Sequence, residues 1–460
     1  MKGKLAVLVA LQVVFMIIGF GVQAEVEITE LRKLFDKFTV AGEINLFYGF
    51  YSKPYYGAPI PGTSDESTTW SESYSRISFS GLKILPWASL TGSAGFLWAA
   101  TMDQDVYGIY KDKSETDIDW AYLRLDNLFN SPFDLTVGRQ YINIEKNMII
   151  GQGYFQKAAS WSLFHRAWPF AVRLDGNFGP FKINALWAKS QNYWQEPGLD
   201  DPNKTIGRDG VDVAGINLHY SITEIDYVFG GFYKKLDNSR ILKQNFAGTG
   251  KELHVSSDTE AYDLGADLTF GPFNFEGEFV YERGKAGRLG DTELDREAAG
   301  LVTSARYTLN APYSPFLRVH FIYLSGDDNP NDSHVDDYDP MFYPYYAWNR
   351  YFIGLLVGPT QLPFTNKKVR IIEIGFAPTK WSNIFLIWLN HRLNERFYLG
   401  APVTHKEWAN ELNLISELYV TANLFINVSL GYAIPSTAAK EILGNADNAF
   451  LAQTWFKFFF

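Results

Sequence analysis

Basic side chains alternate with apolar residues along many stretches of the chain. Arg173, for example, stands between Val172 and Leu174. The same alternation is expected to place nine basic residues on the polar face of a strand, lining a passage: Arg76, Arg124, Arg139, Arg173, Lys182, Arg306, Arg318, Arg392 and Arg396. Arginine binds a carboxylate through two parallel hydrogen bonds, and its charge does not titrate near neutral pH. A ladder of such groups could pass an anionic solute from site to site.

Acidic residues fall on the same polar faces. The expected inward acids are Glu43, Asp263, Asp267, Glu276, Glu278, Glu282, Glu373, Glu411 and Glu417. Any single arginine could therefore be a structural partner of an acid or a direct contact for a solute, and the pattern leaves both roles open. Glu276, Glu278 and Glu282 are expected to face Asp263 and Asp267 across one hairpin. We therefore expect a charged, wet passage with an acidic wall.

Arg139 fits the alternation only if its strand carries an extra residue. A β-bulge at Gly138 would place Arg139 on the same face as Tyr141, Asn143 and Glu145. Glycine inside a strand often marks such a bulge. The sequence therefore predicts a bulge at Gly138.

A long polar and aromatic segment covers residues 327–365. Loops longer than about 15 residues are commonly lids or constrictions. The residues of interest here are Asp327, Asp328, Asn331, Asp332, Tyr343 and Trp348. The aromatic rings could stack on sugars, or they could pack within the loop or at the membrane interface. The four oxygen-bearing side chains lack the spacing of a known calcium loop, so no metal is predicted, and Ca²⁺ stays an open alternative.

The elements that position these side chains are predicted to be membrane-spanning strands. Stretches such as residues 40–46 and 262–268 alternate apolar and polar residues, and the 460-residue chain contains 36 Phe, 27 Tyr and 38 Gly. These strands are too many and too aromatic for the interior of a soluble sandwich. In a membrane β-barrel the apolar face contacts lipid and the polar face lines water. We therefore predict an all-β, antiparallel transmembrane barrel.

Connection lengths give the number of strands. Eight short turns are expected, near residues 85–87, 130–132, 179–180, 223–224, 271–272, 311–312, 378–380 and 421–423. Nine longer polar segments are expected between them, around 53–69, 103–115, 151–163, 197–210, 239–257, 287–293, 327–365, 400–405 and 436–448. Seventeen connections predict about 18 strands with both termini in the periplasm, and this even number is typical of bacterial barrels.

The two ends of the chain carry export and assembly signals. Lys2 and Lys4 precede an apolar run, and Ala24 ends a small-residue cleavage site, so residues 1–24 are predicted to be a signal peptide. Residues 25–37 are expected to form a short periplasmic segment, and residues 38–460 the barrel. The last strand alternates and ends in Phe460, which we expect the barrel assembly machinery to recognise.

Several classes of function are disfavoured by composition. The chain has no cysteine and a formal net charge of −10. Thiol chemistry, cysteine-ligated metals and nucleic-acid binding are therefore not expected. Neither GxSxG, HExxH nor a P-loop occurs, and the seven histidines are scattered. We predict no enzyme activity and no cofactor, while a hydrolase with Ser and His on the outer wall stays an alternative.

Three groups of residues resemble the alginate export family of outer-membrane porins. The stretch Leu135–Gln140, which is followed by Ile149-Ile150-Gly151, is similar to the LTVGRQ strand of that family. Leu324–Asp332 resembles its SGDDNPxD loop, and the segment 339–344 resembles the later Phe-rich part. Glu411–Leu414 resembles its ElDl strand, although Asn413 stands in the place of Asp. The order of these pieces covers essentially the whole mature chain.

The resemblance implies a channel in the bacterial outer membrane for passive diffusion or export of hydrophilic solutes, with anionic saccharides contacting the arginines. The expected acidic wall argues against alginate itself. A general, weakly selective porin and a barrel that sheathes a partner protein are the alternatives. Outer-membrane lipid and the solute are the expected partners.

Overall fold

The fold is seen in a computed structural model of the chain. It describes residues 38–60, 63–85, 90–106, 111–145, 148–150, 158–159, 167–190, 211–237, 244–245, 252–254, 258–289, 292–339, 354–362, 365–398, 401–444 and 447–460. The expected signal peptide 1–24 and the periplasmic segment 25–37 lie outside these residues, so the division of the chain before residue 38 stays a prediction.

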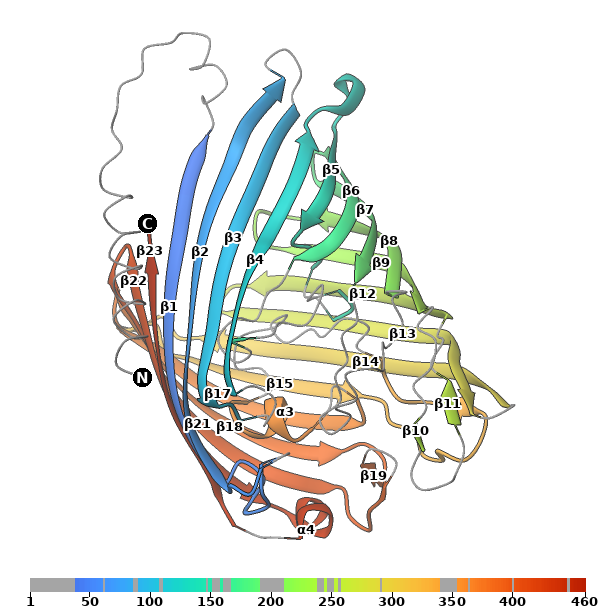
Figure 1. The fold of residues 1–460 in the computed structure, drawn as a ribbon, viewed down its shortest axis with the longest axis vertical. Helices are drawn as coiled ribbons and strands as arrows, with labels where there is room; N and C mark the ends of the chain where they lie inside the picture. The colour runs from blue at the N-terminus through green and yellow to red at the C-terminus, as the bar shows by residue number, and fades with distance from the viewer. Residues whose placement is uncertain are drawn as a thin grey trace.

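The described strands form one closed antiparallel barrel (Figure 1). Its eighteen long strands are β1 (Thr39–Ser52), β2 (Ser67–Leu85), β3 (Leu90–Gln104), β4 (Lys111–Leu125), β5 (Phe133–Gln140), β6 (Trp168–Phe178), β7 (Phe181–Ser190), β8 (Val211–Ser221), β9 (Tyr227–Asp237), β12 (Asp258–Phe270), β13 (Phe273–Leu289), β14 (Thr292–Thr308), β15 (Phe316–Leu324), β17 (Lys367–Thr379), β18 (Ser382–Leu393), β21 (Glu407–Thr421), β22 (Leu424–Pro435) and β23 (Ala449–Phe459). Each pairs with its neighbours along the chain, and β1 also pairs with β23. The predicted all-β antiparallel barrel of 18 strands is confirmed, and the periplasmic location of both termini stays a prediction.

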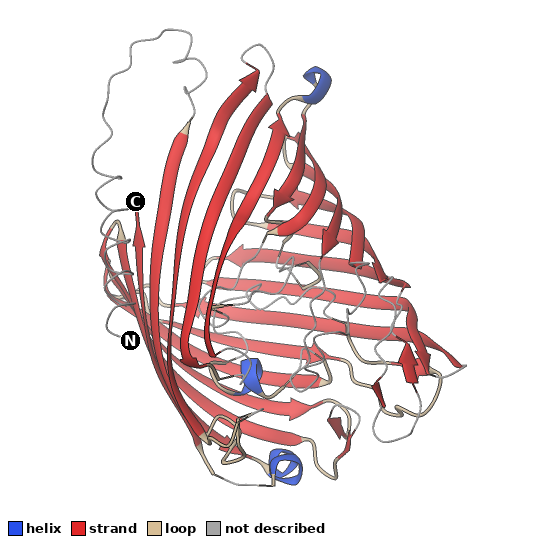
Figure 2. Ribbon diagram, viewed as in Figure 1, coloured by secondary structure: helices blue, strands red, loops and turns tan. Residues whose placement is uncertain are grey.

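Shorter elements complete the described structure (Figure 2). They are β10 (Gln244–Asn245), β11 (Glu252–His254), β16 (His334–Val335), β19 (Phe397–Tyr398), β20 (Ala401–Pro402), the 3-10 helix η1 (Leu128–Asn130), α3 (Val357–Thr360) and α4 (Thr437–Leu443). No helix in the described part of the chain is long and apolar enough to cross a membrane.

The two faces of the barrel have opposite polarity. Along β1, Leu46 and Tyr48 are 43% and 53% exposed, whereas the alternate residues Asn45 and Phe47 are buried. Similar exposed apolar side chains occur on the other strands. This outer apolar surface suits lipid, and the inner surface carries the polar residues. The alternation in the sequence therefore predicts correctly which face is which.

The eight short connections fall where the sequence predicts them, and one predicted long connection does not. Residues 287–293 were expected to be a loop, but β13 runs to Leu289 and β14 begins at Thr292. Polar residues here belong to a paired hairpin: the Lys285 Nζ lies 3.1 Å from Glu293 and 2.6 Å from Asp295. Charged side chains outnumber the buried Ala286 and Leu294 at this end of the hairpin, so its composition resembles that of a loop.

The bulge predicted at Gly138 is confirmed. The register between β5 and β6 shifts between Gly138 and Gln140, and Gly138 has a φ of +129°. A Cβ at this position would lie 2.5 Å from the carbonyl oxygen of Ala121. Glycine is therefore required here both by the backbone angle and by the approach of β4.

The C-terminal residue joins the barrel seam. The Phe460 N–H donates to the Gly42 carbonyl at 3.0 Å, and the Gly42 N–H donates to the Phe460 carbonyl at 2.8 Å. A Cβ on Gly42 would overlap the ring of Phe460. The terminal ring thus packs over a glycine next to the closing strand pair.

We predict that Phe460→Asp lowers the yield of folded barrel, because a carboxylate replaces the ring that packs at the seam. Heat-modifiable mobility on gels measures this yield. Phe129→Asp is the matched control, since Phe129 is 93% exposed beside a short turn. Equal folding yields for the two variants would contradict a role of Phe460 in assembly.

The side of the membrane on which the loops lie can be tested with single cysteines, since the chain has none of its own. Ser64→Cys and Asp336→Cys lie in long connections, and Asn130→Cys lies in a short turn. We expect an impermeant thiol reagent to label the first two on intact cells and to leave the third unlabelled. Labelling of Asn130→Cys would place the short turns, and with them the termini, outside the cell.

Candidate functional site

Two connections fold into the lumen. Ile149 from the β5–β6 connection and Leu356 from the β15–β17 connection belong to one buried cluster with the wall residues Trp70 and Trp408. Figure 1 shows α3 inside the outline of the barrel. An 18-stranded barrel is too wide for wall side chains to fill. The connections therefore narrow the lumen.

Glu411 on β21 holds one of these connections. Its carboxylate accepts the backbone N–H groups of residues 355–357 at 2.6, 2.9 and 3.0 Å. The Nε2 of His391 lies 3.2 Å from the same carboxylate, and both side chains are fully buried. Carboxylates that accept several backbone N–H groups form strong, charge-assisted hydrogen bonds. Glu411 therefore fixes the start of α3 against the wall.

Gln361 fixes the other end of the same segment. Its Nε2 donates to the Pro54 carbonyl at 2.5 Å, and its Oε1 accepts the Trp408 Nε1–H at 2.8 Å. The Lys367 Nζ donates to the Leu362 carbonyl at 3.1 Å. Residues 354–362 are thus tied to β17, β21 and the β1–β2 connection.

Two further predicted acids contact the inward connections. Glu278 accepts the Met148 N–H at 3.2 Å, and Glu282 accepts the Asp339 N–H at 2.8 Å. The Tyr338 hydroxyl donates to the Met148 carbonyl at 2.9 Å and so joins the two connections. Two of the five acids of the expected wall, Glu278 and Glu282, are therefore in contact with the chain's own loops.

Arg76 is the centre of a buried network. It pairs with Glu43 at 2.5 Å and with Asp119, and it donates to the Tyr141 hydroxyl at 2.7 Å. The alternation of the sequence did not reveal Asp119 as a partner. A register shift between Gly95 and Phe96 turns both Asp119 and Trp120 inward, and strict alternation cannot show this.

Three other predicted arginines also have acidic partners. Arg124 binds Asp126 at 2.6 Å and Asp134 at 2.7 Å, Arg139 binds Asp117 at 2.8 Å, and Arg173 binds Asp175 at 2.9 Å. In two of these pairs the acid follows two residues after the arginine, which is a spacing that the sequence could have revealed. These contacts favour the structural role that the sequence left open.

Arg392 and Arg396 were predicted to face inward; the structure contradicts this for Arg392, and for Arg396 the inward placement stays a prediction. Arg392 has the parity of the exposed Trp388 on the outer face, while the alternate His391 is buried inside. Arg392 pairs with Glu407 at 2.8 Å, and Arg396 lies beyond the end of β18. Near the rim the outer face also meets water, so a polar residue there no longer indicates the lumen.

The remaining predicted positions lie on the inner face. Lys182 is exposed beside the short β6–β7 turn, and Glu417 is half-buried. Asp267 accepts a hydrogen bond from the Asn274 side chain at 2.7 Å, and Glu276 accepts one from the Ser304 hydroxyl at 2.9 Å. The carboxylate of Glu373 lies 3.2 Å from the His320 Nε2. Asp263 is buried on β12.

Arg306 and Arg318 differ from the other arginines. They are directly opposite each other across β14 and β15 on the inner face. Both guanidinium groups lie over the Phe316 ring, at 3.9 and 5.5 Å from its centre. Arg318 lies 3.6 Å from Glu373, and Arg306 forms no ion pair or hydrogen bond with any described residue. Glu373 and Glu276 both lie near enough to interact with Arg306, but neither forms a direct ion pair with it, so its guanidinium is without an acidic contact partner among the described residues.

Three acids of the predicted 327–365 loop gather in the part of the loop that follows β15. The carboxylates of Asp327, Asp328 and Asp336 lie within 4.8 Å of one another. Burial raises the pKa of Asp327 to about 6. Asp332 instead accepts a hydrogen bond from the Asn329 Nδ2 at 3.1 Å. Asn331 is exposed. Tyr343 and Trp348 lie outside the described residues.

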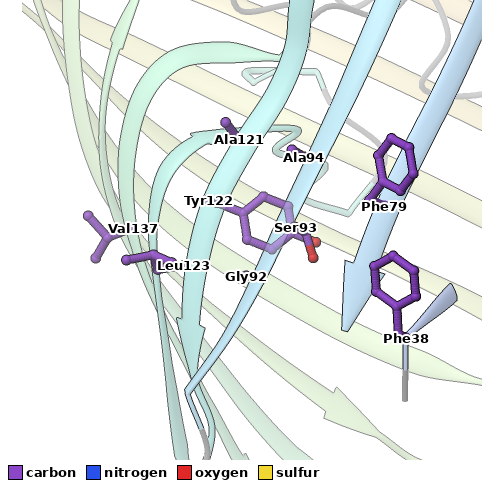
Figure 3. Close-up of a pocket in the computed structure, with 9 residues that line it drawn as sticks. All are labelled: Phe38, Phe79, Gly92, Ser93, Ala94, Ala121, Tyr122, Leu123 and Val137. Carbon is purple, nitrogen blue, oxygen red and sulfur yellow. The ribbon is translucent and has the colours of Figure 1, made fainter. Parts of the chain in front are cut away.

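A pocket of about 410 Å³ lies on the outer wall, away from these charges (Figure 3). Phe38, Phe79, Leu123 and Val137 surround small residues of β3 and β4. Its lining is mainly apolar and faces lipid, so it is not part of the solute path.

Solved structures with this fold are outer-membrane porins. A BenF-like porin from Pseudomonas fluorescens Pf-5 has a TM-score of 0.56 and 8% identity, with 93% of this chain and all of that chain covered. Acinetobacter baumannii OccAB4 has a TM-score of 0.53 and 10% identity, covering 92% and 99%. Pseudomonas aeruginosa OccK2 (OpdF), in complex with glucuronate, has a TM-score of 0.53 and 12% identity, covering 92% and 98%. At these identities the likeness establishes the fold alone.

Sequence comparison gives the family. A search of the curated proteins finds no match. The model of the alginate export family matches residues 99–355, which is more than half of the chain. This region contains the LTVGRQ stretch, the inward β5–β6 connection and the Arg306–Arg318 pair. The chain therefore belongs to the alginate export family, whose members are bacterial outer-membrane proteins.

Proposed function

We propose that this outer-membrane channel passes anionic hydrophilic solutes, uronate-type saccharides among them, and that Arg306 and Arg318 bind their carboxylates. The observation that carries the proposal is the cross-strand arginine pair on the inner face. Like charges directly opposite each other in a sheet are unfavourable. A passing carboxylate would relieve this repulsion and could accept hydrogen bonds from both guanidinium groups.

The surroundings of the pair support this role. Glu373 is the acid that contacts Arg318, and His320 shares the same carboxylate. By contrast, Arg76, Arg124, Arg139 and Arg173 hold acidic partners at short distances. A solute would therefore gain most from Arg306 and Arg318. Glucuronate, the ligand of the distant structural neighbour OccK2, is a suitable probe because it is a uronate.

The segment 354–362 is proposed to set the width of the same channel. It lies within the lumen, and Glu411 and Gln361 fasten it to the wall. A narrow lumen brings a solute close to the wall charges and strengthens selection by charge. The alternative is a general, weakly selective porin, in which the inward arginines are offset by their acidic partners and do not bind the solute.

The arginine pair can be tested by electrical recording of the reconstituted barrel. Arg306→Gln/Arg318→Gln should shift the reversal potential toward cation selectivity and weaken block by glucuronate. A charged hydrogen bond contributes about 1.5–3 kcal/mol, which corresponds to roughly tenfold or more in blocking concentration.

Arg173→Gln/Asp175→Asn is the matched control, because it removes an inward ion pair without changing the net charge. We expect it to cost about 0–1 kcal/mol of stability and to leave glucuronate block unchanged. If glucuronate blocks the Arg306→Gln/Arg318→Gln barrel as strongly as the wild type, the proposed site is eliminated and a weakly selective porin is left.

The clamp on residues 354–362 predicts a change in conductance. Glu411→Ala leaves three backbone N–H groups without their acceptor, at a cost of about 1–3 kcal/mol each in a buried site. We expect the segment to loosen and single-channel conductance to increase. Glu407 lies on the same strand, but it pairs with Arg392 at the rim and forms no hydrogen bond or ion pair with this described segment. Glu407→Ala is therefore the control and should conduct like the wild type. Unchanged conductance in Glu411→Ala would show that the segment does not limit the channel.

A further inference from the structure

Three strands place buried oxygen atoms around one glycine of the inner wall. Asn217 on β8, Gly231 on β9 and Asp263 on β12 are adjacent in register. Gly231 has no side chain, so the Asn217 and Asp263 side chains, whose strands lie about 9–10 Å apart, have the ring edge and hydroxyl of Tyr233 between them on the wall. The ring of Tyr233 covers this glycine, and a Cβ on Gly231 would lie 2.9 Å from the Tyr233 hydroxyl oxygen.

The inward β5–β6 connection adds a second carboxylate to this place. Asn217 donates from Nδ2 to Glu145 Oε1 at 2.7 Å, and the His219 Nδ1 lies 3.1 Å from the same oxygen. The Glu145 side chain is 10% exposed. Glu145 and Asp263 are close enough to repel each other. Two carboxylates, one amide and one phenol therefore meet at the inner wall.

Several of these atoms lack a partner. The Asn217 Oδ1, the Tyr233 hydroxyl and the Asp263 Oδ1 are buried without a hydrogen bond, and the three residues are 4%, 1% and 7% exposed. Among the described residues, no lysine or arginine forms an ion pair with Glu145 or Asp263. Buried charges are costly unless they are paired or bind a metal. A positive group would satisfy both the charge and the oxygen atoms.

We propose that a divalent cation of the calcium type binds between Glu145 and Asp263, with the Asn217 Oδ1 as a third ligand. Carboxylate and amide oxygens are the ligands that Ca²⁺ prefers, and water completes its coordination. The Tyr233 hydroxyl lies beside these ligands and can donate to a carboxylate or to a bound water. The site shares no residue with the acidic group of Asp327, Asp328 and Asp336 in the β15–β17 connection.

The bound ion would join the β5–β6 connection to the wall. Glu145 belongs to this connection, whereas Asn217 and Asp263 belong to the barrel. The ion would also offset part of the negative charge on the β12–β13 side of the lumen. The inference does not depend on which solute the channel passes.

The test uses the purified full-length barrel in detergent, stripped with a chelator and then titrated with Ca²⁺ alone. We expect calorimetry to detect binding and the unfolding temperature to rise with Ca²⁺ until it saturates. Asp263→Asn and Glu145→Gln should each weaken this binding at least tenfold and remove the rise in unfolding temperature.

Two controls assign the binding. Asp267→Asn removes the next inward acid along β12, whose partner is Asn274, and should keep the Ca²⁺ response. Asp328→Asn/Asp336→Asn removes two of the three acids in the β15–β17 connection and should leave the response that depends on Asp263 intact. Glu145 lies outside the strands, so Glu145→Gln stays informative if Asp263→Asn folds poorly.

Two results would overturn the proposal. The first is a Ca²⁺ response in Asp263→Asn or Glu145→Gln equal to that of the wild type. The second is a wild-type barrel that binds no Ca²⁺ while Asp263→Asn unfolds at a higher temperature than the stripped wild type. In that case a proton or ordered water, and no metal, satisfies Asp263.

Discussion

The pairing of β1 with β23 is the interaction on which the rest of the structure depends. Lipid offers no hydrogen-bond partners to an open strand edge, so a membrane sheet has to close on itself. The seam runs from the Glu43–Phe459 pair to the Ser52–Phe450 pair, and the Phe460 backbone extends it to Gly42. Closure with eighteen strands then fixes a wide lumen, and this width determines what the inner face must do.

A wide lumen explains why so many inward acids contact loops. Connections that fold inward bring backbone N–H groups into a place with little water, and these groups need acceptors. Glu411, Glu278 and Glu282 supply them from the wall. These three acids thereby anchor the inward connections to the wall.

The sequence predicts the strands well because lipid and water impose a strict two-residue period on most of each strand. It fails where that period is broken. The register shift beside Gly95 turns Asp119 inward with Trp120, so the main partner of Arg76 could not be identified. At the rim both faces are polar, and Arg392 was placed on the wrong one. The contact of Glu411 with residues 355–357 depends on how a loop folds back, which no local pattern contains.

Charge selection in this lumen is set by the charges left over after internal pairing, and the number of basic residues is a poor guide to it. Arg76, Arg139 and Arg173 are offset by carboxylates at hydrogen-bond distance, and a solute could bind them only by displacing those partners. Arg306 has no direct ion pair among the described residues, and Arg318 lies 3.6 Å from Glu373, so a carboxylate can approach Arg306 without displacing a bound acid. The same reasoning applied with opposite sign to Glu145 and Asp263 leads to a bound cation. One rule, that buried charge must be matched, thus underlies both proposals, an anion at β14 and β15 and a cation at β8 and β12.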